Sequence, residues 1–250
     1  MPQQHGGASK LQVGQKGKKE HMKIGGLQKV SLIDYPGKIS AVIFTQGCNF
    51  RCPYCHNPEL VEQKLYRPCL PEKDILEFIA TRRGKLDAVT ITGGEPTLQE
   101  NLISFIQKIR KLGFAVKLDS NGSRPDVLAR LIREKLLDYI AMDVKAPTEK
   151  YQNVVKVPVD IDVIRESIQL VLKANMPHEF RTTVVTSLLT QKDIAAIARE
   201  IAGAKRYVLQ KFQPARTLNK IFLKEKTCSD DDLIKIKKQM EKDIPLIIIR

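Results

Sequence analysis

The chain lacks any apolar run that approaches the roughly 20 residues a helix needs to cross a bilayer. Its first residues also lack the apolar stretch of a secretory signal. Both absences argue against a membrane-spanning or secreted protein, so we expect a cytoplasmic one. Hydrophobic residues still make up 42% of the 250 residues, which is enough for the core of one large domain.

Cysteine is scarce and unevenly distributed. The chain has five cysteines, an odd number, and three of them fall between positions 48 and 55. A disulfide framework would be more even and more widely spread. We therefore expect reduced thiols, some of them bound to metal. Cys69 and Cys228 stand alone and are expected to be small buried hydrophobic residues.

Acidic residues are a minority, with 28 Asp and Glu against 42 Lys and Arg, for a net charge of +14. Residues 1–21 contain four lysines against one glutamate and show no packing pattern. We expect them to be a disordered basic leader, native or not, ahead of a single domain at 22–250. Without the leader's +3, the chain still carries +11. Such a charge reflects either solvated lysines or an affinity for acidic proteins, nucleic acid or anionic cofactors.

Short strand-like runs alternate with helical patterns along the rest of the chain. The runs are 39–45, 86–92, 114–119, 139–144, 180–186 and 207–212, with a last candidate at 244–249. The helical patterns are 72–83, 98–112, 125–137, 161–174, 193–202 and 230–241. Repeated strand–helix units predict parallel strands joined by right-handed crossovers. Six units predict a curved, incomplete α/β barrel of the (β/α)6 type, with its chemistry at the carboxyl ends of the strands.

A C-x3-C-x2-C spacing follows the first run, at Cys48, Cys52 and Cys55. Three thiolates on a tight loop suit three irons of a 4Fe–4S cubane, and they leave the fourth iron open to a substrate or cofactor. A structural zinc would normally recruit a fourth ligand, and His56 is poorly placed because it directly follows Cys55. A zinc site and a simple electron-transfer cluster remain alternatives. No second cysteine-rich segment is present, so we expect one cluster.

The next two runs end in residues that suit a small ligand. Gly93 and Gly94 let a ligand approach the backbone and leave N–H and C=O groups free to bind it, while Glu95 adds a charge. The alternative is an ordinary Gly–Gly turn. Ser120 and Asn121 suit hydroxyl groups of a ligand, although Asn-Gly also suits a turn.

Charged residues accompany the following two runs. Asp143 and Lys145 lie two residues apart on one strand face, where they form either part of a ligand site or a buried ion pair. Arg181 offers a fork that matches a carboxylate, or else packs as an ordinary arginine.

Together these motifs resemble the radical S-adenosylmethionine (radical SAM) superfamily, whose hallmark is a C-x3-C-x-aromatic-C loop. The resemblance implies that S-adenosylmethionine chelates the free iron, and that one electron from the cluster cleaves it to a 5′-deoxyadenosyl radical. The Gly-Gly-Glu-Pro segment matches the family motif that binds the amino group of the cofactor's methionine. The residues assigned to the cofactor on this basis are Tyr54, Gly93, Gly94, Glu95, Ser120, Asn121, Asp143, Lys145 and Arg181.

Two further segments are similar to the activating enzymes of glycyl-radical enzymes, above all those that serve anaerobic ribonucleoside-triphosphate reductase. They are KIGGLQKVSLIDYPGK at 23–38 and Cys-His-Asn-Pro at 55–58, and the similarity extends from Met22 onward. It implies that the radical removes a hydrogen atom from a glycine of that reductase. It also implies a flavodoxin- or ferredoxin-type electron donor.

Two other functions fit the same residues. A radical SAM enzyme acting on another glycyl-radical enzyme, a small molecule, a peptide or RNA would share the motifs. The chain shows no RNA-binding module, which argues against nucleic acid as a partner. A non-catalytic iron–sulfur electron carrier would use the cysteines but would not need a cofactor loop after the second run.

Overall fold

A computed structural model describes residues 21–250 of the chain. They form one eight-stranded sheet in which strands consecutive in sequence are neighbours in space. β1 runs antiparallel to β2, and every later pair is parallel. The strands are β1 Ile24–Ser31, β2 Ser40–Thr45, β3 Ala88–Gly93, β4 Ala115–Ser120, β5 Tyr139–Asp143, β6 His178–Val184, β7 Tyr207–Lys211 and β8 Ile247–Ile249. The predicted basic leader lies outside the described residues, apart from His21.

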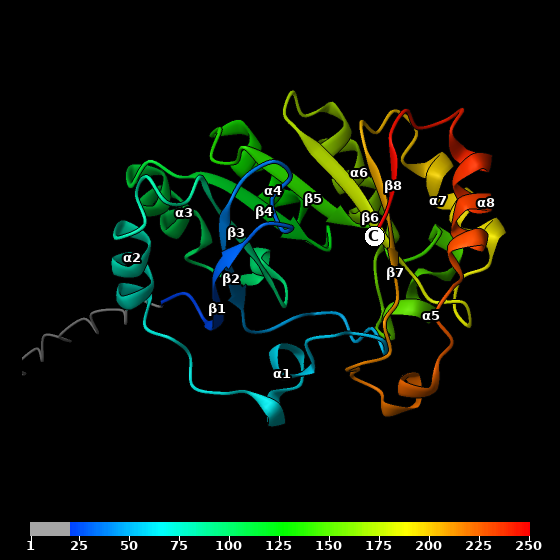
Figure 1. Cartoon of the computed structure of the whole chain (residues 1–250), viewed down its shortest axis with the longest axis horizontal. Helices are drawn as coiled ribbons and strands as arrows, with labels where there is room; N and C mark the ends of the chain where they lie inside the picture. The colour runs from blue at the N-terminus through cyan, green and yellow to red at the C-terminus, as the bar shows by residue number, and fades with distance from the viewer. Residues whose placement is uncertain (1–20) are drawn as a thin grey trace, which may run out of the picture.

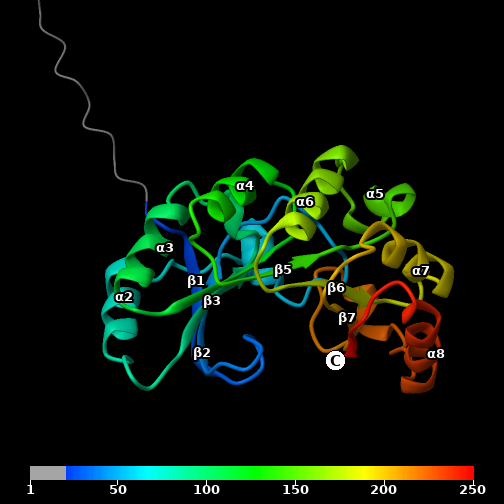
Figure 2. The same ribbon diagram turned by 90° about the horizontal axis from the view of Figure 1, so that it is seen from above.

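Helices follow most strands and cover the outer face of the sheet. The α-helices are α1 Pro58–Val61, α2 Glu72–Ala80, α3 Leu102–Lys111, α4 Pro125–Arg133, α5 Tyr151–Val155, α6 Ile161–Lys173, α7 Gln191–Glu200 and α8 Asp230–Met240. Short 3-10 helices are η1 Gln63–Leu65, η2 Pro96–Leu98, η3 Thr148–Lys150 and η4 Lys220–Lys224. Figure 2 shows α3, α4, α6 and α7 around the convex side of the curved sheet. No helix within residues 21–250 has the length and apolar character needed to span a membrane.

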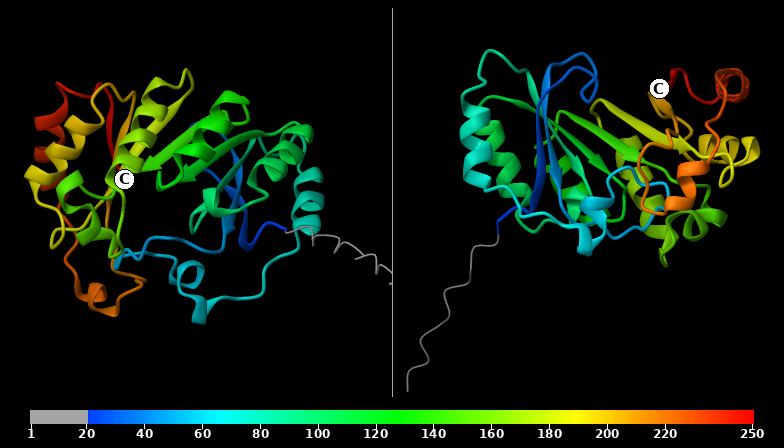
Figure 3. Two further views of the ribbon diagram at one scale, coloured as in Figure 1. Left: turned by 180° about the vertical axis from the view of Figure 1, so that it is seen from behind. Right: turned by 60° about the horizontal axis from the view of Figure 1, so that its bottom comes forward.

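The sheet does not close into a complete barrel. β1 and β8 are its two edges, and in the described part of the chain no pairing joins them. Figure 1 and Figure 3 show a curved sheet that runs from the β1–β2 hairpin to β8. The predicted incomplete α/β barrel is therefore confirmed, with β2 to β7 as its six parallel strands.

Strand β1 is the main element that the sequence analysis did not identify as a strand. It contains two glycines, Gly25 and Gly26, and its second half exposes Gln28, Lys29 and Val30. Without a buried face along its full length, it lacks the apolar alternation that marks a strand. Its pairing with β2, rather than its own sequence, makes it part of the sheet.

The two faces of the sheet carry different residues, as β4 illustrates. Val116 and Leu118 are fully buried in the hydrophobic core between sheet and helices. Because successive side chains alternate in a strand, Lys117 and Asp119 point the other way, to the concave side. Both are also buried, with exposed fractions of 1% and 7%. At β4, the concave face of the sheet therefore carries buried charged side chains.

Candidate active site

A cavity of about 410 Å³ lies at the carboxyl ends of the parallel strands and extends along their concave face. This volume is within the range of about 300–1,000 Å³ typical of small-molecule sites. All twelve predicted site residues line it: Cys48, Cys52, Tyr54, Cys55, Gly93, Gly94, Glu95, Ser120, Asn121, Asp143, Lys145 and Arg181. They come from the last residues of β3, β4 and β5, from the loops after β2, β3, β4 and β5, and from β6, so the fold brings together residues far apart in sequence.

The cysteine loop follows β2 and is held by its own backbone and by neighbouring segments. The Cys55 N–H donates to the carbonyl of Cys52 at 3.0 Å, and the Arg51 guanidinium donates to the carbonyl of Cys48 at 2.7 Å. The Arg51 N–H donates to the carbonyl of Val155 in α5 at 2.9 Å. Backbone and side-chain hydrogen bonds therefore hold this loop in place.

The three thiols of the loop are largely buried, and their arrangement is compatible with an iron–sulfur cluster. Burial is the main cause that raises the pKa of the Cys48 thiol to about 12 and that of Cys52 to about 11, and it also raises the pKa of Cys55. Thiols in such a setting become thiolates when a bound cation displaces their protons. Within residues 21–250, no three His, Cys, Asp or Glu side chains converge closely enough to hold one ion. Ligands to three separate irons need not converge on one point.

The Gly-Gly-Glu-Pro loop differs from the expectation that its amide groups are free for a ligand. The Gly94 N–H donates to the carbonyl of Thr45 at 2.9 Å, and the Glu95 N–H donates to that of Gly47 at 2.8 Å. A Cβ on Gly93 would stand 2.5 Å from the Thr45 nitrogen. The glycines thus allow this loop to pack against the start of the cysteine loop, and these two N–H groups are already used.

Glu95 is buried, with 1% of its surface exposed, and its carboxylate ties two strand ends together. It accepts hydrogen bonds from the Ser120 hydroxyl at 2.9 Å and the Asn121 N–H at 2.7 Å. The Thr97 N–H donates to it at 3.1 Å. Burial raises the pKa of Glu95, and these donors oppose the rise. Glu95 therefore holds the loop after β4 at the cavity wall.

Two other predicted residues present polar groups beside the cysteines. The Asn121 side-chain amide donates to Asn49 at 3.0 Å and lies 4.0 Å from the Cys48 sulfur. The Tyr54 hydroxyl lies near the Cys52 thiol but makes no hydrogen bond of ordinary geometry within residues 21–250. A buried hydroxyl without a partner is unfavourable unless a ligand supplies one. Tyr54 therefore fits a site that a polar cofactor completes.

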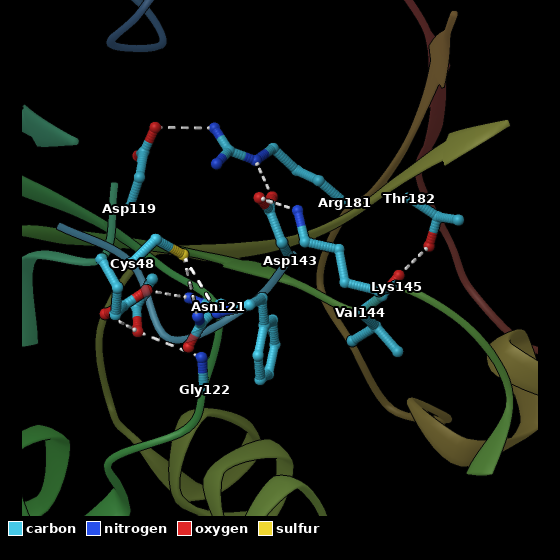
Figure 4. A network of polar contacts seen from close by, with 12 residues as sticks. Cys48, Asp119, Asn121, Gly122, Asp143, Val144, Lys145, Arg181 and Thr182 are labelled. Carbon is cyan, nitrogen blue, oxygen red and sulfur yellow. Dashed lines mark hydrogen bonds and ion pairs between the residues drawn. The ribbon is translucent and has the colours of Figure 1, made fainter. Parts of the chain in front are cut away.

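Five alternating charges form a chain along the concave face, and Figure 4 shows four of them, Asp119, Arg181, Asp143 and Lys145. Arg181 donates through Nε to Asp143 at 2.7 Å and through Nη1 to Asp119 at 2.8 Å. Lys145 pairs with the second oxygen of Asp143 at 2.7 Å, and Lys117 pairs with the second oxygen of Asp119. The network as a whole has three cations and two carboxylates, and its two cavity-lining cations are Lys145 and Arg181.

This network explains why the pKa values of its two carboxylates are lowered. Burial alone would raise the pKa of Asp143, but Arg181 and Lys145 hold that pKa well below its usual range. The pKa of Asp119 is likewise lowered by Arg181 and Lys117 against the effect of burial. Asp119, Asp143, Lys145 and Arg181 therefore stay charged, and the two cations among them line the cavity, where they suit an anionic group such as a carboxylate.

Lys117 was not predicted as a site residue. It does not itself line the cavity, but it holds Asp119, which does. A lysine two residues before an aspartate in a buried strand was the available signal. Phe50, Thr183 and Asp34 also line the cavity without having been predicted. The sequence motifs did not single out these three residues, and the fold places them at the cavity.

Two further cysteines and one histidine are not among the twelve predicted site residues. Cys228 is buried, as expected for a lone cysteine, but Cys69 is exposed, so that expectation was wrong for Cys69. Cys69 follows the turn after η1, where little covers it, and its sulfur lies 3.4 Å from the side-chain oxygen of Gln46. The His56 ring stacks on Phe212 at a centroid distance of 5.4 Å, and His56 also lines the cavity.

Comparison with known proteins agrees with this geometry. Residues 42–201 match the model of the Radical SAM superfamily. A "Putative glycyl-radical enzyme activating enzyme" of Methanocaldococcus jannaschii is 36% identical over 233 residues, which cover 91% of this chain and 95% of that protein. A 7-carboxy-7-deazaguanine synthase of Methanopyrus kandleri is 36% identical over 134 residues, which cover 46% of this chain and 52% of that one.

Among solved structures, Streptococcus suis SuiB bound to its precursor peptide SuiA superposes with a TM-score of 0.63. The match covers 84% of this chain but about half of that one, 48%, and only 13% of residues are identical. This likeness concerns the fold alone. The superfamily match across most of the barrel and the relative that covers nearly the whole sequence show that this chain belongs to the radical SAM superfamily.

Proposed function

We propose that this radical SAM enzyme is the activating enzyme of a glycyl-radical enzyme, specifically anaerobic ribonucleoside-triphosphate reductase. The observation that supports it most is the 36% identity to a protein named as a glycyl-radical enzyme activating enzyme, because it spans 91% of the chain. The segment at 23–38 and the Cys-His-Asn-Pro sequence favour the reductase as the partner.

Radical SAM enzymes use one 4Fe–4S cluster and S-adenosylmethionine, and this chain has the three cysteines for the cluster. When bound, this pair supplies a 5′-deoxyadenosyl radical able to remove the hydrogen atom from a glycine Cα. Cys48, Cys52 and Cys55 would hold the cluster. The protein otherwise contributes binding, orientation and exclusion of solvent.

The remaining residues would bind the nucleoside and amino-acid parts of the cofactor. Lys145 and Arg181 place positive charge where a carboxylate can bind, while Asp143 fixes both cations. Gly93 and Gly94 keep the cavity wall close to the cysteine loop, and Ser120, Asn121 and Tyr54 supply hydroxyl and amide groups. Glu95 holds Ser120 and Asn121 in place.

The open side of the sheet suits a protein substrate. Hydrogen transfer requires the reacting atoms to be about 3–3.5 Å apart, so a loop of the partner must enter the cavity. Because β1 and β8 are not paired, the concave side is not enclosed by a ring of strands. A fully enclosed cavity would favour a small substrate instead.

The proposal also includes an electron-donor protein as a partner and the reducing cytoplasm as the location of the enzyme. A flavodoxin- or ferredoxin-type donor would supply the electron that the cluster needs. The three cavity thiols must be reduced to bind iron, and this condition is met in the cytoplasm.

The decisive experiment uses protein whose cluster is reconstituted without oxygen. We would reduce it, add S-adenosylmethionine, and measure 5′-deoxyadenosine with and without an anaerobic ribonucleotide reductase, together with the electron paramagnetic resonance spectrum. Cleavage with a glycyl-radical signal on the reductase is the expected result. Cleavage without that signal would reject the reductase as substrate. No cleavage despite a reducible cluster would favour a non-catalytic electron carrier.

A second candidate is a radical SAM enzyme that acts on a small molecule. It is favoured by the 36% identity to a 7-carboxy-7-deazaguanine synthase, although that match covers only 46% of this chain. Consumption of a small substrate in the absence of any partner protein would separate it from the activating enzyme.

A further inference from the structure

The segment after β7 lies along the outer side of the cysteine loop. The Asn219 N–H donates to the carbonyl of Pro53 at 2.9 Å, inside the cysteine motif. The Phe212 ring, at the start of the segment, stacks against His56. Figure 3 shows this orange segment, which includes η4, at the same end of the molecule as the light blue cysteine loop. A molecule bound to η4 would therefore lie beside the cysteine loop.

This segment presents a basic surface with an apolar centre, which we call the η4 patch. The patch comprises Arg216, Lys220, Ile221, Leu223, Lys224 and Lys226, all of them exposed. Ile221 is 74% exposed, so its side chain packs on almost nothing in this chain. Exposed apolar side chains rimmed by charge are typical of protein–protein contacts.

The lysines of the patch are free to attract a partner. Within residues 21–250, none of the ammonium groups of Lys220, Lys224 and Lys226 forms an ion pair. The carboxylate of the neighbouring Glu225 accepts hydrogen bonds from the Thr186 and Ser187 hydroxyls, at 3.1 and 2.6 Å. Unbalanced positive charge on one face speeds association with an acidic protein.

We propose that the η4 patch is the docking site of a small electron-transfer protein with an acidic face, which reduces the cluster. The step transfers one electron from the reduced donor, which is thereby oxidised by one electron, to the cluster, and no atom moves. This inference rests on the proposed function, since only an enzyme with a redox cluster requires such a donor.

The position of the patch separates the donor from the substrate. None of its residues lines the cavity. The substrate glycine must enter the cavity to react, whereas an electron crosses an intervening layer of protein. Docking on η4 therefore leaves the concave side free, so donor and substrate protein bind at the same time. Weak electron-transfer encounters also need only a small interface, below about 1,200 Å².

The test compares two charge-reversal variants of the cluster-loaded protein. One is Lys220→Glu with Lys224→Glu. The other is Lys85→Glu with Lys111→Glu, two exposed lysines near α2 and α3 at the far end of the molecule (Figure 1). Both variants change the net charge equally, but only the first alters the η4 patch. Binding of an acidic, oxidised flavodoxin would be measured by calorimetry, and cluster reduction by its hydroquinone would be followed by stopped-flow absorbance.

At low salt, we expect the η4 variant to bind flavodoxin at least about tenfold more weakly than the unchanged protein. We also expect flavodoxin to reduce its cluster at least about tenfold more slowly. The difference should shrink as salt rises, since exposed charges are screened. The control should match the unchanged protein. Equal binding and reduction rates in both variants would overturn the proposal.

Dithionite, a small reductant that needs no docking site, separates this inference from the proposed function. With dithionite, the η4 variant should cleave S-adenosylmethionine and act on the reductase as the unchanged protein does. If dithionite-driven glycyl-radical formation falls while flavodoxin reduces the cluster normally, the patch binds the substrate protein and the donor proposal is wrong. If the unchanged protein forms no glycyl radical with dithionite, the proposed function fails whatever flavodoxin binding shows.

Discussion

Gly94 lies directly against the backbone of Gly47, so that a Cβ atom on Gly94 would stand 2.0 Å from the Gly47 carbonyl oxygen. The next N–H, that of Glu95, donates to the same oxygen at 2.8 Å. This contact joins the loop after β3 to the start of the cysteine loop. The position of the cluster ligands therefore depends on a glycine that lies 39 to 46 residues away from them in sequence.

Gly94→Ala should separate these loops. The added methyl group would collide with backbone that cannot rotate away, and such overpacking costs about 1–3 kcal/mol of unfolding free energy. Cluster occupancy should fall as well, measured as iron per protein after reconstitution. Gly26→Ala is the matched control, because its nearest neighbour, Phe44, would be 3.6 Å away. Equal stability and iron content in the two variants would contradict the prediction.

Replacing Cys48, Cys52 or Cys55 by Ala should abolish the cluster, because each thiolate holds a different iron. The measurement is iron and sulfide content with the spectrum of the reduced protein. Cys69→Ala, which removes an exposed thiol outside the cavity, should leave the content unchanged. Normal iron in all three loop variants would reject the cluster assignment.

Glu95→Ala should weaken S-adenosylmethionine binding while the cysteines still hold the cluster. It leaves the Ser120 hydroxyl and the Asn121 N–H without their buried acceptor, which costs about 3 kcal/mol of unfolding free energy. Calorimetry and urea unfolding would measure the two effects. Glu77→Ala, on the exposed face of α2, should change stability by no more than about 0.5 kcal/mol. Unchanged cofactor affinity would remove Glu95 from the site.

Lys117→Met should be destabilising by about 3 kcal/mol, because it takes a cation from a buried carboxylate. Arg181 would then be the only remaining cation paired with Asp119. We expect this to weaken the hydrogen bond from Arg181 to Asp143, because both carboxylates share the same guanidinium. Lys73→Met is the control, since its pair with Glu77 is exposed and such pairs contribute about 0–1 kcal/mol. Urea unfolding that ranks the two variants alike would show that the network is not coupled in this way.

The same network predicts a loss of stability in acid. The pKa values of Asp119 and Asp143 are lowered in the folded protein, whereas the pKa of an aspartate in an unfolded chain is about 3.9. Their stabilisation is therefore complete above about pH 4 and is lost as pH falls through the folded pKa values. Lys117→Met should make this pH dependence shallower, because it brings the pKa of Asp119 closer to its unfolded value. Urea unfolding at several pH values would test this, and an identical slope in the variant would count against it.

The sequence by itself determined the cysteine loop and the alternation of strands and helices. Both are local signals, since the spacing of Cys48, Cys52 and Cys55 lies within one loop and periodicity lies within one element. The same holds for the Gly-Gly-Glu-Pro segment, whose place at a strand end could be predicted, although the use of its N–H groups could not.

Only the tertiary structure decided which polar residues act together. Arg181 meets Asp143 and Asp119 across 38 and 62 residues of sequence, because β4, β5 and β6 are adjacent in the sheet. The packing of Asn219 against Pro53 likewise joins distant segments. Register and curvature of the sheet set these contacts, and no local pattern encodes either one.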